Sequence, residues 1–135
     1  MARMPRSRVR LSWTGIVSFT RRLRANAATA RSLNDELVAE HGITIEQYEV
    51  LGRIARSPDM RVRQADLDDP PLVTAPNVER VLRDLEQDQL VDRGAEGDAR
   101  VVALTDDGRA KLLAVRSNRA AQLDELLGPT DLPRH

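Results

Sequence analysis

The sequence predicts a mainly helical fold with a single β-hairpin close to its C-terminal third. Apolar residues recur at helical spacing in several segments, and residues that begin or end helices stand at the boundaries of those segments. Only residues 90–102 combine short β-prone pieces with a turn-rich centre. The chain has 135 residues, a length that favours one domain with a core of its own.

The N-terminal part divides into a basic arm and a long helix. Residues 1–10, MARMPRSRVR, are rich in arginine and lack a core pattern, which predicts a flexible arm ahead of a single domain at residues 11–135. A helical period begins at Leu11 and predicts one long helix, or two segments joined by a bend. Gly42 suits the end of that helix, because glycine adopts the left-handed conformation at little cost. The long helix is therefore expected within residues 11–42.

Two shorter helices are predicted next. Thr44 is expected to cap a helix with the sequence TIEQYEVLGRIARS, in which Gln47 stands at the capping-box position. Pro58 stops this helix, since proline supplies no amide donor. The buried stripe of this helix is expected to be Tyr48, Leu51 and Ile54. The segment VRQADLDD then predicts a short helix whose inward side is Val62, Ala65 and Leu67.

A strongly amphipathic segment predicts a helix over residues 75–88. Thr74 is a good N-cap, and Pro76 is tolerated in a first helical turn, where no amide donor is needed. One face of this helix carries the apolar stripe Val78, Val81, Leu82 and Leu85. The opposite face carries Pro76, Arg80, Arg83 and Gln87. That second face is either a binding surface or only solvated, and the neighbouring segments decide between the two readings.

The hairpin and a last helix complete the chain. Residues 90–91 and 101–102 are β-prone, and the sequence GAEGDA between them predicts the loop of a two-stranded hairpin. Thr105 is expected to cap a final helix, which a Gly-Pro pair ends. A second long helix is therefore expected within residues 105–127.

Composition and motifs exclude several classes of function. The chain has no cysteine, which excludes disulfides, thiol chemistry and cysteine-type zinc sites. Its two histidines, His41 and His135, are too far apart to suggest a metal site. There is no nucleophile elbow, glycine-rich phosphate loop or paired acid–base group, so we expect no catalytic residue, no cofactor and no enzyme. No apolar run approaches a membrane span, which predicts a soluble, cytoplasmic protein.

Charge is distributed unevenly along the chain. The net charge is zero, yet residues 1–57 carry an excess of five basic groups and residues 58–100 an excess of five acidic groups. Of the 21 basic residues, 20 are arginine, the residue that suits phosphate contacts best. The amphipathic helix thus lies in an acidic segment, where a search for basic clusters alone would miss it.

The order of helices and hairpin is that of a winged helix-turn-helix, and residues 44–104 resemble the MarR family of winged-helix transcription regulators. ITIEQYEVLGRIA looks like the helix ahead of the family's DNA-binding helices, and VRQADL looks like its short helix before the turn. VLRDLEQDQLVDR is similar to the stretch that leads into the family's wing. DAR at residues 98–100 resembles a motif of the wing, and LTDDG at residues 104–108 resembles the start of the helix after it.

The resemblance implies a dimeric regulator of transcription. In the family, the terminal helices form the dimer body, here residues 11–42 and 105–127. Two winged lobes then contact adjacent major grooves of a pseudo-palindromic operator in double-stranded DNA, and residues 75–88 are the recognition helix. The family fold thus implies a homodimer, and we expect a repressor. The candidate DNA-binding residues are Arg63, Thr74, Asn77, Arg80, Arg83 and Arg100.

These candidates have different expected roles. Asn77 and Arg80 stand near the start of the helix, where asparagine can read adenine and arginine can read guanine. Thr74, as N-cap, and Arg63 suit phosphate. Each role has a local alternative. Asn77 could cap the helix, Arg83 could pair along it, and Arg100 could pair with a neighbouring aspartate in the hairpin.

Several departures from the family pattern favour a second hypothesis. Glu79 stands where the family often has a small hydroxyl residue, and Gln89 replaces the usual glycine at the helix end, so Gln89 is expected to be left-handed. The wing is about three residues shorter than is common, and the family's final helix is missing. The alternative is a degenerate winged-helix protein that acts through protein–protein contacts without binding an operator.

Effector binding is expected only by analogy with the family. Many members bind small aromatic effectors between the dimer body and the winged lobe. Trp13, His41 and Tyr48 are the candidates for such a cleft. Each also has a structural reading, because tryptophan and tyrosine commonly pack in cores or interfaces and His41 stands at a helix end.

Overall fold

The computed structural model describes residues 13–68 and 71–128, with side chains described from Ala27 onward. Its elements in chain order are α1 (Trp13–His41), α2 (Ile45–Ala55), η1 (Pro58–Met60), β1 (Arg61–Arg63), η2 (Gln64–Asp68), α3 (Val78–Gln87), β2 (Val91–Glu96), β3 (Ala99–Leu104) and α4 (Asp106–Leu127). The basic arm expected at residues 1–10 lies outside the described residues.

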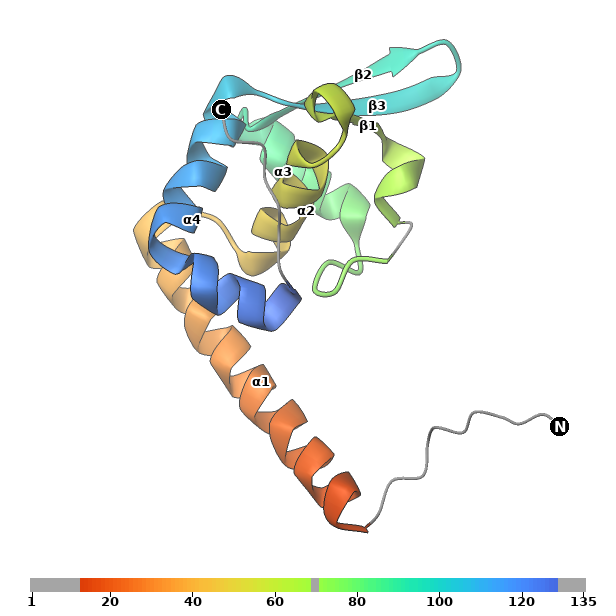
Figure 1. Cartoon of the computed structure of the whole chain (residues 1–135). Coiled ribbons are helices and arrows are strands. Elements are labelled where there is room, and N and C mark those ends of the chain that lie inside the picture. The colour runs from red at the N-terminus through yellow and green to blue at the C-terminus, as the bar shows by residue number, and fades with distance from the viewer. Residues whose placement is uncertain (1–12, 69–70, 129–135) are drawn as a thin grey trace, which may run out of the picture.

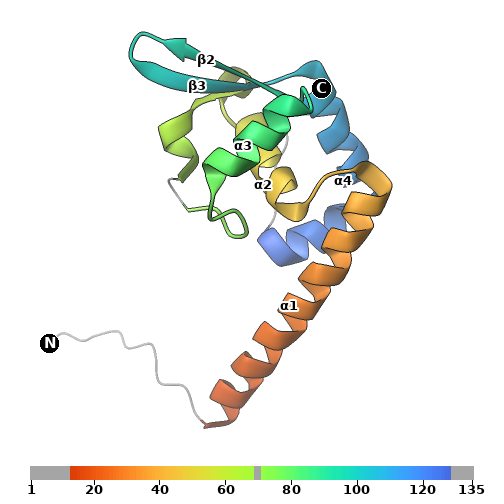
Figure 2. The same cartoon turned by 180° about the vertical axis from the view of Figure 1, so that it is seen from behind.

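The elements form a mainly helical lobe with an antiparallel sheet at one edge. α2, η2 and α3 pack together, and the β2–β3 hairpin extends beyond them as a wing (Figure 1). α4 returns alongside the C-terminal part of α1, while the N-terminal part of α1 projects away from the lobe (Figures 1 and 2). α1 is one continuous helix, which settles the choice between one helix and two.

The junction between α1 and α2 follows local signals. Gly42 has a φ of +72°, the left-handed conformation expected after a helix end. The Thr44 hydroxyl accepts a hydrogen bond from the Gln47 amide at 3.1 Å. The Gln47 side chain accepts one from the Thr44 amide at 2.8 Å, which completes the expected capping box. These bonds satisfy amides that an isolated helix start would leave unpaired.

The core lies between the helices and one face of the sheet. The apolar stripe of α3 is buried as expected: Val78, Val81, Leu82 and Leu85. The expected stripe of α2 is also buried: Tyr48, Leu51 and Ile54. Among described side chains, no polar or charged residue belongs to the fully buried set. Burial of these apolar surfaces, at about 25 cal/mol per Å², is the main stabilising contribution to the lobe.

The predicted two-stranded hairpin is confirmed, but residues 61–63, expected to start a short helix, instead form a third strand of its sheet. β1 pairs antiparallel with β3, and Val62 lies opposite Val102. Leu67 is buried as expected, but Ala65 is exposed. The reason is long-range: residue 61 aligns with residue 103, and this pairing supplies the hydrogen bonds that a local helical turn would otherwise make.

The hairpin loop was also predicted too long. β2 and β3 stay paired through Glu96 and Ala99, so only Gly97 and Asp98 form the turn. Gly97 has a φ of +62°, which suits such a tight connection. Much of the GAEGDA segment is therefore strand, and the wing is an extended ribbon despite its few residues.

Two further positions connect α3, the wing and α4. Gln89 has a φ of +62°, so the expected left-handed turn without glycine is confirmed. Gly108, in the first turn of α4, lies so close to the hairpin base that a Cβ there would stand 2.1 Å from the Leu90 carbonyl oxygen. Thr105 caps α4 as expected, by accepting a hydrogen bond from the Gly108 amide at 2.9 Å.

Among residues 13–68 and 71–128, no helix has the length and apolar character that crossing a membrane requires.

Candidate nucleic-acid interface

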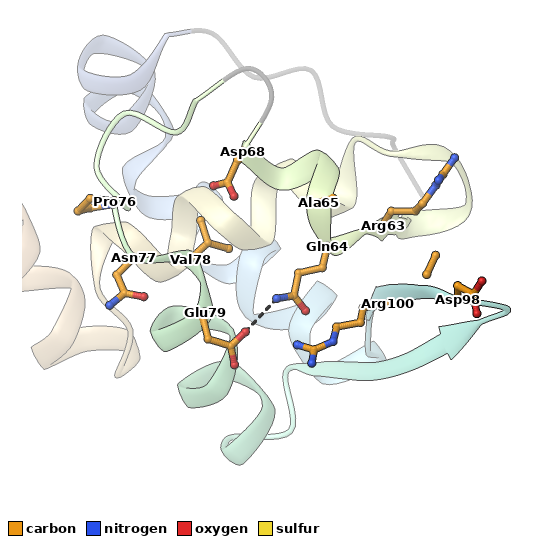
Figure 3. Close-up of a pocket in the computed structure, with 11 residues that line it drawn as sticks. Arg63, Gln64, Ala65, Asp68, Pro76, Asn77, Val78, Glu79, Asp98 and Arg100 are labelled. Atoms are coloured by element: carbon orange, nitrogen blue, oxygen red, sulfur yellow. Dashed lines mark hydrogen bonds between the residues drawn. The ribbon is translucent and has the colours of Figure 1, made fainter.

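The start of α3, η2 and the tip of the wing surround an open cavity of about 900 Å³. Arg63 and Gln64 come from the β1–η2 junction, Asn77 and Glu79 from the start of α3, and Arg100 from β3 (Figure 3). The cavity brings together residues that are up to 37 positions apart, between Arg63 and Arg100. Its lining is mixed in charge: Arg63 and Arg100 face it from the β1 and β3 side, and the carboxylates are Asp68, Glu79 and Asp98.

Helix α3 begins later than expected, and Asn77 is its N-cap. The Asn77 side-chain oxygen accepts a hydrogen bond from the Arg80 amide at 3.1 Å. The local capping role considered for this residue is therefore present. The side chain is still exposed on the cavity, and its amide nitrogen makes no hydrogen bond to a described residue.

Thr74 is not the N-cap, contrary to expectation. Its amide and its hydroxyl both donate hydrogen bonds to the Glu49 carboxylate, at 2.7 and 2.8 Å. The Val73 amide donates to the same carboxylate. Because Glu49 occupies these donors, the helix-start argument for a phosphate contact at Thr74 no longer applies. Through these hydrogen bonds, Glu49 anchors the loop before α3.

The Arg80 side chain lies on the exposed face of α3. Its side chain is 57% exposed and lies 3.4 Å from a carboxylate oxygen of Glu46, on α2. This distance and exposure make a weak ion pair that a stronger partner can replace. Arg83, three residues later, is exposed and makes no ion pair with any described residue, so the pairing along the helix considered for it is not observed.

Arg63 and Arg100 lie on the opposite side of the cavity. Both side chains are exposed, and neither makes an ion pair within residues 13–68 and 71–128. The ion pair with Asp98 that was considered for Arg100 is therefore not formed. The neighbouring strand residue Arg61 differs, since it pairs with Glu96 across the wing.

A network that local sequence patterns did not predict links α3 to the wing. The Arg93 guanidinium, from β2, donates to both carboxylate oxygens of Glu79 at 3.1 and 3.2 Å. Arg93 also donates to Glu86 at 3.2 Å, and the Gln64 side-chain nitrogen donates to Glu79 at 2.9 Å. The hydrogen bonds from Arg93, and next that from Gln64, hold the pKa of Glu79 below its usual range.

The fold has counterparts in solved structures. AbsC, a MarR family transcriptional regulator from Streptomyces coelicolor, is 22% identical, with a TM-score of 0.72 over 88% of this chain and 82% of that one. Another MarR family regulator from that organism, solved in complex with DNA, is 19% identical, with a TM-score of 0.74 over 90% of this chain and 78% of that one. The complex of Staphylococcus aureus MepR with DNA is 24% identical, with a TM-score of 0.64 over 82% and 80% of the two chains.

The likeness extends to the sequence pattern of a known family. A profile described as MarR family matches residues 41–101, which contain α2, β1, α3, β2 and the start of β3. The chain is therefore similar to the MarR family over this part of its length. No curated protein sequence matches the chain at a significant level.

Two of the candidate effector residues, His41 and Tyr48, line different cavities. His41 lines an open cavity of about 570 Å³ together with Lys111, whose ammonium donates to the His41 carbonyl oxygen at 2.8 Å. Tyr48 borders a different cavity, of about 90 Å³, and its hydroxyl accepts a hydrogen bond from Arg116 at 2.7 Å. Burial raises the pKa of Tyr48. The side chain of Trp13 lies outside the described part of the chain.

The junction between α1 and α4 uses arginines that sequence patterns did not single out. Arg119 of α4 pairs with Glu36 at 2.9 Å and with Glu40, both on α1. The Glu40 hydrogen bond raises the pKa of Arg119. Arg116 pairs with Asp124 at 3.1 Å within α4. The pairs of Arg119 join α4 to α1, although they are partly exposed and contribute modestly.

Proposed function

We propose that this chain is a DNA-binding regulator of transcription, a dimeric repressor that reads a pseudo-palindromic operator with α3. The observation that carries the proposal is the arrangement of α3: one face packs its apolar stripe into the core, and the other presents Asn77 and Arg80 beside an open cavity. A recognition helix needs this division, because it must be held by the lobe while its N-terminal half enters the major groove. The DNA complexes of two structurally similar regulators support the proposal.

The local distribution of charge also supports it. Residues 58–100 are net acidic, but two carboxylates of α3, Glu79 and Glu86, are bonded to Arg93, and Glu96 is bonded to Arg61. Arg63 and Arg100 line the cavity, Arg80 and Arg83 stand on α3, and all four are exposed. Phosphate contacts depend on the local field within about a Debye length, roughly 8–10 Å, so the net charge of the segment is not decisive.

A selection experiment combined with a salt series tests DNA binding. Genomic fragments bound by the purified protein should contain an inverted repeat, and affinity for that site should fall steeply with salt. Arg63→Ala should weaken binding to all sequences alike and flatten the salt slope by about one unit, because it removes one phosphate contact.

Arg61→Ala is the matched control for Arg63→Ala. Both residues stand on the same strand, but the charge of Arg61 is already neutralised by Glu96, so its loss should leave the slope nearly unchanged. Absence of any enriched sequence, with a shallow salt dependence, would reject operator binding. The protein-contact hypothesis would then explain the fold better.

Dimerisation through α1 and α4 is the second part of the proposal. Three large apolar side chains are exposed in the described residues, and two of them, Val38 at 46% and Leu113 at 44%, lie on these helices. The N-terminal part of α1 also extends beyond the lobe without a neighbour from the described residues (Figure 2). Light scattering at micromolar protein should give twice the mass of one chain.

Acidic substitutions test which surface holds the dimer. Val38→Glu combined with Leu113→Glu should increase the monomer fraction, because charges would be buried without partners. Val73→Glu, at the third exposed apolar residue and outside both helices, should leave the mass unchanged. A monomer mass for the unaltered chain would contradict the dimer and remove the geometric basis for a two-half-site operator.

A further inference from the structure

Glu79 is a carboxylate held in a fixed position on the face assigned to DNA. It stands in the first turn of α3, lines the cavity beside the wing, and its side chain is 43% exposed. Arg93 bonds both of its oxygens, and Gln64 bonds one of them (Figure 3). An acidic group with three hydrogen bonds from two different elements has little rotational freedom. Its position is therefore set before any ligand arrives.

The bonding of Glu79 leaves room for one more donor. An ionised carboxylate offers about four acceptor sites, and three hydrogen bonds from described residues occupy Glu79. Two of these bonds go to one oxygen, so the other oxygen keeps the remaining site. A phosphate group cannot fill that site, since it brings negative charge and no donor. A partner that donates a hydrogen bond can fill it.

Among the base edges of the major groove, cytosine fits this site best. Cytosine presents the N4 amino donor and places no acceptor of its own on that edge. Adenine places its N7 acceptor beside its N6 donor, so a carboxylate that approaches the amino group also meets a repulsive lone pair. Guanine and thymine present acceptors to a carboxylate.

We propose that Glu79 is a specificity-determining residue that accepts a hydrogen bond from the N4 amino group of one cytosine in each operator half-site. This proposal rests on the proposed function, because it requires α3 to enter the major groove. It names the base that is read at one operator position. It also names the residue that reads this base, Glu79, whose negative charge opposes phosphate binding. Glu79 then lowers affinity for random duplex while it raises the preference for one base pair.

A purely structural role is the competing explanation, and the chain offers a matched control for it. Glu86 is on the same helix, has a similar side-chain exposure of 46%, and also bonds Arg93, at 3.2 Å. It stands in the last turn of α3 and does not line the cavity. If Glu79 acted only by holding Arg93, loss of the Glu86 charge should have a comparable effect on base preference.

The experiment measures affinity for every single-base-pair variant of the selected operator, using the full chain and its Glu79→Gln and Glu86→Gln variants. The unaltered protein should lose about tenfold in affinity when one particular C·G pair is replaced. Glu79→Gln should show no preference at that pair, keep its preferences elsewhere, and bind random duplex more tightly. Glu86→Gln should retain the preference. Thermal unfolding followed by circular dichroism checks that each variant is folded.

Glu79→Asp provides a second variant that keeps the charge. Because its carboxylate is one methylene shorter, it should keep weak binding to random duplex but lose most of the preference at the same C·G pair. The proposal is overturned if Glu79→Gln retains the preference or if Glu86→Gln loses it equally. Failure of the unaltered protein to select any sequence would overturn the proposed function as well, so the two failures are distinguishable.

Discussion

Arg80→Ala is expected to weaken binding to the selected operator by about 1–3 kcal/mol and to relax the base preference at one position, the loss expected for a bidentate base contact. Arg80 lies in the first half of α3, opposite the buried stripe, and its side chain is more than half exposed. Nothing in the core depends on it, so the variant should remain folded. Affinities for the operator and for random duplex, each measured at several salt concentrations, give the result.

Glu46→Gln is the companion variant for Arg80→Ala. It removes the ion pair at 3.4 Å that holds the Arg80 side chain, so it should leave operator binding unchanged or make it tighter. If Arg80→Ala instead binds the operator as tightly as the unaltered protein, α3 is not the reading helix. The polar face of α3 would then be only solvated, and the protein-contact hypothesis would become the better explanation.

Leu82→Ala is expected to lower the free energy of unfolding by about 2–5 kcal/mol, the range for removing a large apolar side chain from a packed core. Leu82 has 0% exposure and belongs to the stripe that fastens α3 to the lobe. Denaturant unfolding followed by circular dichroism measures the change. All samples must have the same protein concentration, since dimerisation contributes to apparent stability.

Arg83→Ala is the control for Leu82→Ala. Arg83 is the next residue on the same helix, but it is exposed, so its replacement should change stability by no more than about 0.5 kcal/mol. Equal effects of the two substitutions would mean that the stripe of α3 does not carry the packing described above. Comparable thermal midpoints for the unaltered chain and Leu82→Ala would indicate the same.

Signals that act within a few residues predicted much of the fold. The capping box of Thr44 and Gln47, the left-handed Gly42 and the cap at Thr105 each depend on bonds across three or four positions. The apolar stripe of α3 depends on helical periodicity alone, and it is buried as expected. Such features are encoded locally, because the interacting groups are already close together in the chain.

The candidate interface was predicted less completely. Arg63, Arg80 and Arg100 could be named from the sequence, and the structure places Arg63 and Arg100 on one cavity beside the start of α3. The hydrogen bonds that position Glu79 could not be predicted, because Arg93 and Gln64 are 14 and 15 residues away from it. No periodic pattern links β2, η2 and α3 at those separations.

By itself, the sequence determined the two long helices, the caps at Thr44 and Thr105 and the apolar face of α3, since these depend on neighbours along the chain. Tertiary structure alone decided that residues 61–63 form a strand, because their hydrogen-bonding partners are on β3. It also decided how the loop before α3 is held, because Glu49, 25 residues earlier, takes both donors of Thr74. In each case the polar groups are bonded by a partner that only folding brings near. That partner replaces a hydrogen bond that the local sequence would otherwise have made.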